Sequence, residues 1–403
     1  MTRSPHPSLF FALLLPYGAS FGYVSVAFPY IATHSGGLTA EQAGTVIAAA
    51  FGPHAIKFLW APIVDTTLTK KTWYLIALAL VILGTVVSSS VPIDVARLPL
   101  LTTVIVASQV GLTLMGMATE SFMAHSVAAD QKGRAAGWYQ AGGAFGLGAG
   151  GGAALWLSQH VSASWMVGAA MGTTMLLCAI PLLALAEPPP MGARLSEGMR
   201  ALFRDLKGIA MSRTGALGIV ICLSPVGAGA AFNYFGPNAD AWGASADMVA
   251  LVTGVANGVV TAIGSIGGGF LADRIDRRVA YAIGGGLTAV TGLIMVAAPH
   301  QPWAYVVFTL MYALFNGMAV AGFSGLVLET IGAGAVATKY NVFASLANVA
   351  TSYSIRLDGV AQGKWGANGM LLTDAGLTFA GIAIMLVLAS LLKKRVALEE
   401  PAS

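Results

Sequence analysis

Charged residues are scarce in this chain of 403 residues, where the four charged types together make up 9%. A soluble domain usually carries about 25%, and hydrophobic residues make up 56% of this sequence. The formal net charge is only +4, which is too small to indicate binding to nucleic acid. These quantities exclude an ordinary soluble domain and favour an integral protein of the lipid bilayer.

Motifs for metal binding and nucleotide hydrolysis are also missing. The two cysteines, Cys178 and Cys222, lie in apolar runs, which predicts free buried thiols rather than a disulfide. No C-x-x-C or His-x-x-x-His spacing indicates a metal, and no G-x-x-x-x-G-K-[ST] loop indicates ATP hydrolysis. No Ser–His or carboxylate–metal pattern in an apolar run supports an integral membrane enzyme. We therefore expect no cofactor, no metal and no enzymatic activity.

Apolar stretches of about 20 residues, the length that crosses a bilayer, fill most of the chain instead. No small-x-small cleavage site follows the first stretch, which therefore reads as an uncleaved span. The predicted membrane helices are Leu9–Ile31, Ala40–Pro62, Thr72–Val91, Leu98–Ala124, Ala135–Leu157, Trp165–Leu185, Thr214–Phe235, Met248–Ala272, Val279–Ala298, Pro302–Leu328, Asn341–Val360 and Leu371–Leu392.

The longest polar interruption divides these twelve helices six and six. It predicts an N-terminal bundle at residues 1–186, a linker at 187–213 and a C-terminal bundle at 214–403. With the N-terminus inside, 17 of the 21 Lys and Arg residues fall in cytoplasmic segments, and the outer loops hold only Arg97 and Lys364. This bias predicts that both termini and the linker are cytoplasmic.

A segment with an aspartate and a basic end occurs once in each half. GGGFLADRIDRR, at Gly267–Arg278, follows the glycines of one apolar helix with Asp273 and three arginines. FLWAPIVDTTLTKK, at Phe58–Lys71, has Asp65 in the same place and ends in two lysines. One signature in each half predicts two related halves.

The six-plus-six arrangement, the basic linker and the paired signature together resemble the major facilitator superfamily over essentially the whole chain. KFLWAPIVD at Lys57–Asp65 and ATKYNVFASLAN at Ala337–Asn348 are similar to muropeptide permeases, acetyl-CoA transporters and related siderophore importers. Helix four departs from that branch, because Ser121 and His125 stand where it has carboxylates. The resemblance implies an all-α integral membrane protein of two pseudo-symmetric six-helix bundles, monomeric, in the inner (plasma) membrane of a bacterium.

The resemblance also implies a cytoplasmic gate built on the two aspartates. Asp65 would meet the start of helix eleven at Thr338–Asn341, and Asp273 would meet the start of helix five at Arg134–Gly137. A carboxylate is stabilised at a helix N-terminus by its free N–H groups and by the helix dipole. The alternative is that each aspartate only caps its own loop. The predicted gate residues are Asp65, Lys71, Arg134, Asp273, Arg274, Arg277 and Arg278.

Two charges inside predicted spans are candidates for ion coupling or for binding substrate charge. Lys57 and Glu120 lie at similar depth, and a buried charge needs a partner or water. His54 lies on the same helix face as Lys57, and His125 is near Glu120 in sequence. The alternative is that Lys57 extends its ammonium group to the inner membrane surface.

Polar and aromatic residues on helices one, four, seven and ten are candidates for the substrate cavity, because the resemblance implies that these helices line it. An aromatic stripe on helix ten is more often packing than a ligand platform, which is the alternative. Asp358, in the outer part of helix eleven, is expected to lie near the outer surface. The predicted cavity residues are Tyr23, Gln109, Asn233, Tyr234, Tyr312 and Asn316.

Glycines spaced four apart mark helices five and eight, which face each other in that superfamily. Small residues on one helix face let another backbone approach closely. We expect a smooth seam between the halves, with static close packing as the alternative. The residues concerned are Gly142, Gly146, Gly148, Gly150, Gly152, Gly254, Gly258, Gly264 and Gly268.

The function expected from this sequence is secondary transport by alternating access. A small polar or amphipathic solute would bind near the membrane midplane, and an ion gradient, expected to be protons, would drive its import. A facilitative uniporter or an exporter of the same fold is the alternative within transporters. A non-transporting sensor or a channel is the alternative outside that class.

Overall fold

The computed structural model describes residues 5–34, 37–38, 40–188, 196, 200, 203–204, 207–208, 211, 213–331 and 336–399. Within these ranges every regular element is helical, and eight helices are long and apolar enough to cross a membrane. Large apolar side chains cover the outside, such as Leu183 at 83% exposure, as expected of a surface that faces lipid. Most of the predicted linker, 187–213, lies outside the described residues.

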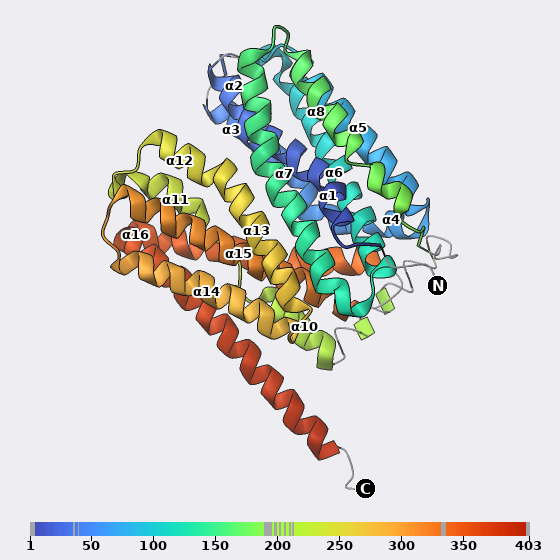
Figure 1. The fold of residues 1–403 in the computed structure, drawn as a ribbon, viewed down its shortest axis with the longest axis vertical. Helices are drawn as coiled ribbons and strands as arrows, with labels where there is room; N and C mark the ends of the chain where they lie inside the picture. The colour runs from blue at the N-terminus through green and yellow to red at the C-terminus, as the bar shows by residue number, and fades with distance from the viewer. Residues whose placement is uncertain are drawn as a thin grey trace.

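The first half of the chain forms one group of helices, blue to green in Figure 1. Thr69 caps the third predicted span, because its side chain accepts a hydrogen bond from the Thr72 amide at 3.2 Å. The elements are α1 (Leu9–Gly22), η1 (Tyr23–Ala27), α2 (Phe28–His34), α3 (Ala40–Ile56), η2 (Lys57–Leu59), α4 (Ala61–Thr66), α5 (Lys70–Ser90), η3 (Val95–Arg97), α6 (Leu98–Ser126), η4 (Ala129–Gln131), α7 (Lys132–His160), α8 (Trp165–Leu177) and η5 (Ile180–Ala184).

The second half forms a second group, yellow to red in Figure 1. Asp276 caps its third span by accepting from the Arg278 amide at 2.8 Å. The elements are α10 (Arg213–Leu223), α11 (Phe232–Asn238), η6 (Ala239–Trp242), α12 (Ala246–Thr253), α13 (Val255–Ala272), α14 (Arg277–Ala297), α15 (Pro302–Thr330) and α16 (Val336–Glu399).

Several predicted spans differ from their expected form. Helix seven, predicted as continuous over Thr214–Phe235, is broken between α10 and α11 by Pro225 and by glycines with positive φ, 65° at Gly227 and 64° at Gly229. Helices eleven and twelve run together as α16, which contains one non-helical residue, Gly366, at φ 68°. Glycine accepts such φ values without the strain that a β-carbon causes.

The two groups meet at one end, here called the closed end, where α7 begins and α13 ends (Figure 1). They splay apart toward α2 and α12, here called the open end. Close backbone contacts join α7 to α13 from the closed end upward, where Gly137 meets Gly269 and Gly148 meets Gly258. The break at Gly254 separates α12 from α13 just above this contact.

The predicted glycine seam is only partly the contact between halves. Gly148 and Gly258 do face each other across it. The stripe that includes Gly146 packs on α1 instead, and Gly264 and Gly268 pack on α15, each within its own group. Four-residue spacing identifies a face that accepts a close neighbour, but it does not say which neighbour.

Candidate functional site

Asp273 lies across the closed end, against the first turn of α7. Its carboxylate accepts from the Gly133 amide at 2.7 Å and from the Arg134 amide at 2.9 Å. The Arg134 Nε group donates a third bond at 2.8 Å, and Arg277 lies 3.9 Å away. The carboxylate therefore satisfies free amides of a helix start in the opposite group, one residue earlier than expected.

Asp65 makes the corresponding contact with the first turn of α16. It accepts from the amides of Ala337 at 3.1 Å and Thr338 at 2.8 Å, and from the Thr338 hydroxyl at 2.8 Å. Its cationic neighbour is Lys70, at 3.9 Å. Burial raises the pKa of Asp65 above its usual range, although donation from Thr338 and the Lys70 charge partly oppose this. A carboxylate this buried depends on keeping its donors.

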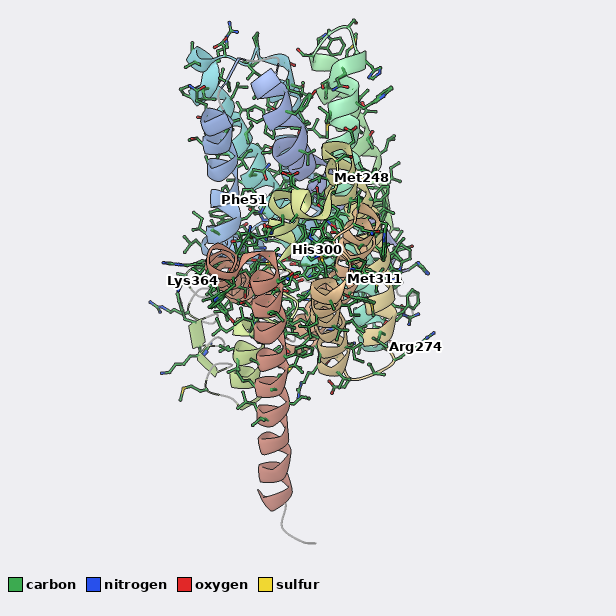
Figure 2. All side chains as sticks on the ribbon, turned by 90° about the vertical axis from the view of Figure 1, so that its left-hand side faces the viewer. Phe51, Met248, Arg274, His300, Met311 and Lys364 are labelled. Atoms are coloured by element: carbon green, nitrogen blue, oxygen red, sulfur yellow. The ribbon has the colours of Figure 1, made fainter. Side chains whose placement is uncertain are left out.

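The basic residues predicted for this end differ in what they contact. Arg134 and Arg277 contact Asp273, and Arg277 also donates to Glu329 at 2.8 Å and to the Ala129 carbonyl at 2.6 Å. Arg278 contributes its amide to the Asp276 cap. Arg274 is exposed at the edge of the molecule (Figure 2). Lys71 lies beside the site, where its amide donates to Glu187, and Lys70 takes the position expected for it.

A cavity of about 710 Å³ lies between the two groups. Its polar residues from the first group include charged side chains, whereas those from the second group are neutral. Aromatic rings such as Phe21 and Phe51 form its apolar wall. The polar residues of its lining include Tyr17, His54, Lys57, Glu120, Tyr139 and Gln140 from the first group, and Asn316, Ser324 and Tyr340 from the second.

Glu120 connects this cavity to the closed end. One carboxylate oxygen accepts from the Tyr139 hydroxyl at 2.9 Å, and the other accepts from the Asn341 amide nitrogen at 2.8 Å. Asn341 belongs to α16, five residues after its first residue Val336, so the second bond joins the two halves. It lies on the same helix start that binds Asp65.

Lys57 lines the same cavity as Glu120 and is close enough to interact with it electrostatically. Its ammonium group forms no hydrogen bond or ion pair with any other described residue. The residue sits in η2, where a short break interrupts the helix between Pro53 and Pro62. Irregular backbone at this depth is tolerated where it faces a cavity.

His54 is held by two neighbours and does not pair with Lys57. Its Nδ1 atom lies 3.1 Å from the Tyr17 hydroxyl, and its Nε2 atom lies 3.0 Å from Gln109 Oε1. His125 is exposed, and its Nδ1 atom lies 2.9 Å from the Ser121 carbonyl oxygen. The structure thus brings Lys57, Glu120 and His54 to one cavity and leaves His125 outside it.

Among the predicted cavity residues, Asn316 lines the cavity, where it donates to the Gly227 carbonyl at 3.0 Å and fixes the broken helix. The others lie outside the lining because their helix faces turn toward neighbouring helices. Tyr23 is in the apolar core, and Gln109 stands behind His54. The remaining three bond to groups within their own half: Asn233 to Ala230, Tyr234 to Ile355 and Tyr312 to Asp374.

Sequence reasoning missed a second polar link across the halves. Gln140 on α7 donates to the Ser324 hydroxyl at 2.6 Å, and the Tyr340 hydroxyl lies 3.0 Å from the same oxygen. Lys132 adds a bond to the Leu328 carbonyl at 3.1 Å. Nothing in these residue types distinguishes them from packing residues until α7 and α15 are placed side by side.

The close packing of α7 against α13 can be tested by adding a side chain at Gly269. A β-carbon at Gly269 would lie 2.6 Å from the Gly133 carbonyl oxygen and 2.8 Å from the Gly137 α-carbon, whereas one at Gly267 would meet nothing within 4 Å. We expect Gly269→Val to lower the free energy of unfolding by about 1–3 kcal/mol, which is typical of overpacking, and therefore to lower the melting temperature of the purified protein more than Gly267→Val does. Equal melting temperatures would contradict this packing.

Comparison with known proteins gives one family and a set of structural neighbours. The family described as the Major Facilitator Superfamily matches residues 9–355. No curated protein sequence matches the chain significantly. The family match covers nearly all of the first predicted bundle and most of the second, but it does not specify a branch within the family.

Solved structures with this arrangement are similar over 94% of the chain. The proton:xylose symporter XylE has a TM-score of 0.70 at 15% identity, with 94% of its chain covered. The transporter FucP in the outward conformation has a TM-score of 0.69 at 15% identity, with 98% covered. The human organic anion transporter MFSD10 has a TM-score of 0.62 at 15% identity, with 98% covered. At these identities the likeness is one of fold.

Proposed function

Because this chain belongs to the Major Facilitator Superfamily, and is therefore a multi-pass membrane transporter and not an enzyme, we propose that it is a proton-coupled symporter of small organic anions. Glu120 carries the proposal, because one side chain faces the Lys57 charge in the cavity and also bonds to Asn341 across the closed end.

The closed end is proposed to be the cytoplasmic end. Among the described residues, Lys70, Lys132, Arg134 and Arg277 make contacts at this end, and basic residues are typical of cytoplasmic segments. Asp65 and Asp273 then act as the two halves of a cytoplasmic gate, and the conformation faces outward. FucP, whose fold the chain shares, was solved in an outward conformation.

Charge balance supports an anionic substrate. An ammonium group in a cavity of low polarity needs a counter-charge, and Glu120 is the nearby carboxylate that supplies it to Lys57. A substrate anion can take over this role only if Glu120 becomes neutral by binding a proton. Anion binding and proton binding therefore favour each other, and by linkage this coupling is reciprocal. The expected cargo is one anion with one proton.

The Asn341 bond supports a link between that exchange and the gate. A hydrogen bond to a charged carboxylate contributes about 1.5–3 kcal/mol, more than the about 1 kcal/mol of a neutral one. Protonation of Glu120 weakens its bond to Asn341 and so loosens the start of α16, which Asp65 also holds. Loading the cavity thus favours opening of the cytoplasmic side.

The shape and lining of the cavity narrow the class of anion. A volume of about 710 Å³ fits a molecule of drug size. Phe21, Phe51 and Tyr17 on one side, with Asn316 opposite, suit an apolar or cyclic body beside the anionic group. The likeness of Lys57–Asp65 and Ala337–Asn348 to muropeptide permeases and siderophore importers is compatible with such cargo. MFSD10 is itself an organic anion transporter.

Replacement of Lys57 tests the substrate class. We expect Lys57→Met to lose saturable uptake of organic anions into proteoliposomes, because the cavity then offers a carboxylate no counter-charge. Lys364→Met is the control, since Lys364 is exposed at the edge of the molecule (Figure 2) and should transport at the wild-type rate. The substrates to screen are mono- and dicarboxylates with aromatic, cyclic and acyl bodies.

Other outcomes point to the alternatives. Saturable uptake that ignores an imposed pH gradient would indicate a uniporter, and outward movement against such a gradient would indicate an exporter. Neutral or cationic solutes that compete for binding equally well in Lys57→Met and wild type would exclude the anion proposal. Flux without saturation would favour a channel.

A further inference from the structure

Two aspartates face each other within the C-terminal half, away from the central cavity. Asp358 lies on α16 before the break at Gly366, and Asp374 lies on α16 after it. Asp358 is 0% exposed and Asp374 is 4% exposed. Their carboxyl groups lie within hydrogen-bonding reach of each other, and neither lines the cavity. The side chain of Asp358 is therefore buried within this half.

Asp358 has no donor for either carboxylate oxygen among the described residues. Asp374 accepts from the Tyr312 hydroxyl on α15 at 2.9 Å, and the amide of Ala231, just before α11, also faces it. Two carboxylates are both acceptors, so the contact between them is a hydrogen bond only when one carries a proton. Two bare charges facing each other in an apolar interior would repel strongly.

Within the described part of the chain, the surroundings supply no cation that pairs with either aspartate. Among the described residues no lysine or arginine forms an ion pair with either aspartate, and Arg356 and Lys364, the nearest basic residues in sequence, are exposed. The cover is apolar, with Phe235 and Met370 in the same core cluster as Tyr312. Tyr234, the titratable residue of α11, donates to the Ile355 carbonyl instead.

Further unpartnered oxygens accompany the pair. The Ser354 hydroxyl, one turn before Asp358 on the same face of α16, is 1% exposed and has no partner among the described residues. The Thr309 hydroxyl, one turn before Tyr312 on α15, is 0% exposed and likewise unpartnered. Buried polar groups are usually paired, so these atoms mark a place where the protein alone leaves hydrogen bonding incomplete.

We propose that Asp358 and Asp374 form a proton-binding site that holds one proton between the two carboxyl groups. The proton joins the two segments of α16 across the Gly366 break, and Tyr312 ties the same pair to α15. Loss of the proton leaves two facing carboxylates and loosens this packing toward the open end. The site lies outside the proposed transport cavity, so it does not depend on the substrate or on Glu120.

Infrared difference spectroscopy tests the site on the purified full-length protein. The spectrum at acid minus alkaline pH should contain a protonated-carboxyl C=O band. Carbon-13 labelling of the aspartate side chains should shift this band in wild-type protein, which separates it from any band of Glu120. Asp358→Asn and Asp374→Asn should each remove it, whereas Asp94→Asn, an exposed carboxylate paired with Arg97 at 3.0 Å, should leave it unchanged.

Thermal unfolding provides a second readout. Because the folded pair keeps its proton where an unfolded aspartate has lost it, the melting temperature of wild type should fall as the pH rises and the pair gives up its proton. In Asp358→Asn the amide can donate to Asp374 at any pH, so this dependence should shrink. A labelled band that does not shift would overturn the proposal. So would a stabilisation by sodium ions that both variants abolish, because it would assign the pair to a metal cation.

Discussion

Glu120→Gln is expected to abolish proton-driven accumulation while leaving exchange of substrate intact. A glutamine is neutral at every pH, so Lys57 loses its counter-charge permanently and the anion no longer needs a proton to bind. We expect the anion to bind about 5- to 150-fold tighter at alkaline pH than it binds to wild type, the usual range of such coupling. An inward proton gradient should no longer raise uptake, whereas counterflow in proteoliposomes should persist.

Glu329 provides the matched control for Glu120. Glu329→Gln makes the same chemical change at an exposed carboxylate whose partner is Arg277, and such surface pairs contribute about 0–1 kcal/mol. It should accumulate substrate with the pH dependence of wild type. If Glu120→Gln also accumulated substrate under a proton gradient at the wild-type rate, Glu120 would not be the coupling residue, whatever its contacts.

The sequence predicted where most of the helices lie, and the resemblance predicted the two acidic contacts of the closed end. Asp65 and Asp273 each follow an apolar helix, and a carboxylate there seeks the free amides of a helix start. The resemblance supplied the partners, which lie one residue earlier than expected. It did not separate Lys70 from Lys71, because adjacent residues at a helix start point in directions that only the packing decides.

The lining of the cavity could not be predicted in the same way. Each helix in a bundle touches several neighbours, and periodicity relates residues within one helix without saying which neighbour a face meets. Tyr312 therefore looked like a cavity residue but bonds to Asp374, and Tyr139 was overlooked although it bonds to Glu120. The pairing of Asp358 with Asp374 was also hidden, since it depends on the turn at Gly366.

Lys57 and Glu120 were paired in the sequence only because they lie at similar depth along their helices, and the structure places both in the lining of one cavity. Depth along a span can be counted from residue number, because each helical residue advances by about 1.5 Å. Depth alone does not predict the break at η2, where Lys57 lies, or the bond between Glu120 and Asn341. In the proposed mechanism, Glu120 is therefore both the counter-charge of Lys57 in the cavity and a bond across the proposed gate.

Loss of either acidic contact should open the closed end. Asp273→Asn removes the charge that binds two amides of α7 and Arg134, and Asp65→Asn does the same at α16. Breaking one partner of a buried charged contact costs about 3–5 kcal/mol, and each 1.4 kcal/mol is about tenfold in a population ratio. We expect each variant to shift the balance away from the outward-facing state by about 100-fold or more, and to transport slowly.

The shift can be measured as a distance between spin labels at Leu68 and Arg274, which are exposed on opposite halves of the closed end, in a background without Cys178 and Cys222. The distance should lengthen in either variant. Asp94→Asn, which removes an exposed charge at the far end, should leave it unchanged. Asp273 contacts α7 and Asp65 contacts α16, so the two contacts join the halves at different places. The double variant should therefore open further than either single variant. Label distances equal to those of wild type in all three would mean that the carboxylates only cap local structure and that the halves are held together by the backbone contacts of α7 with α13.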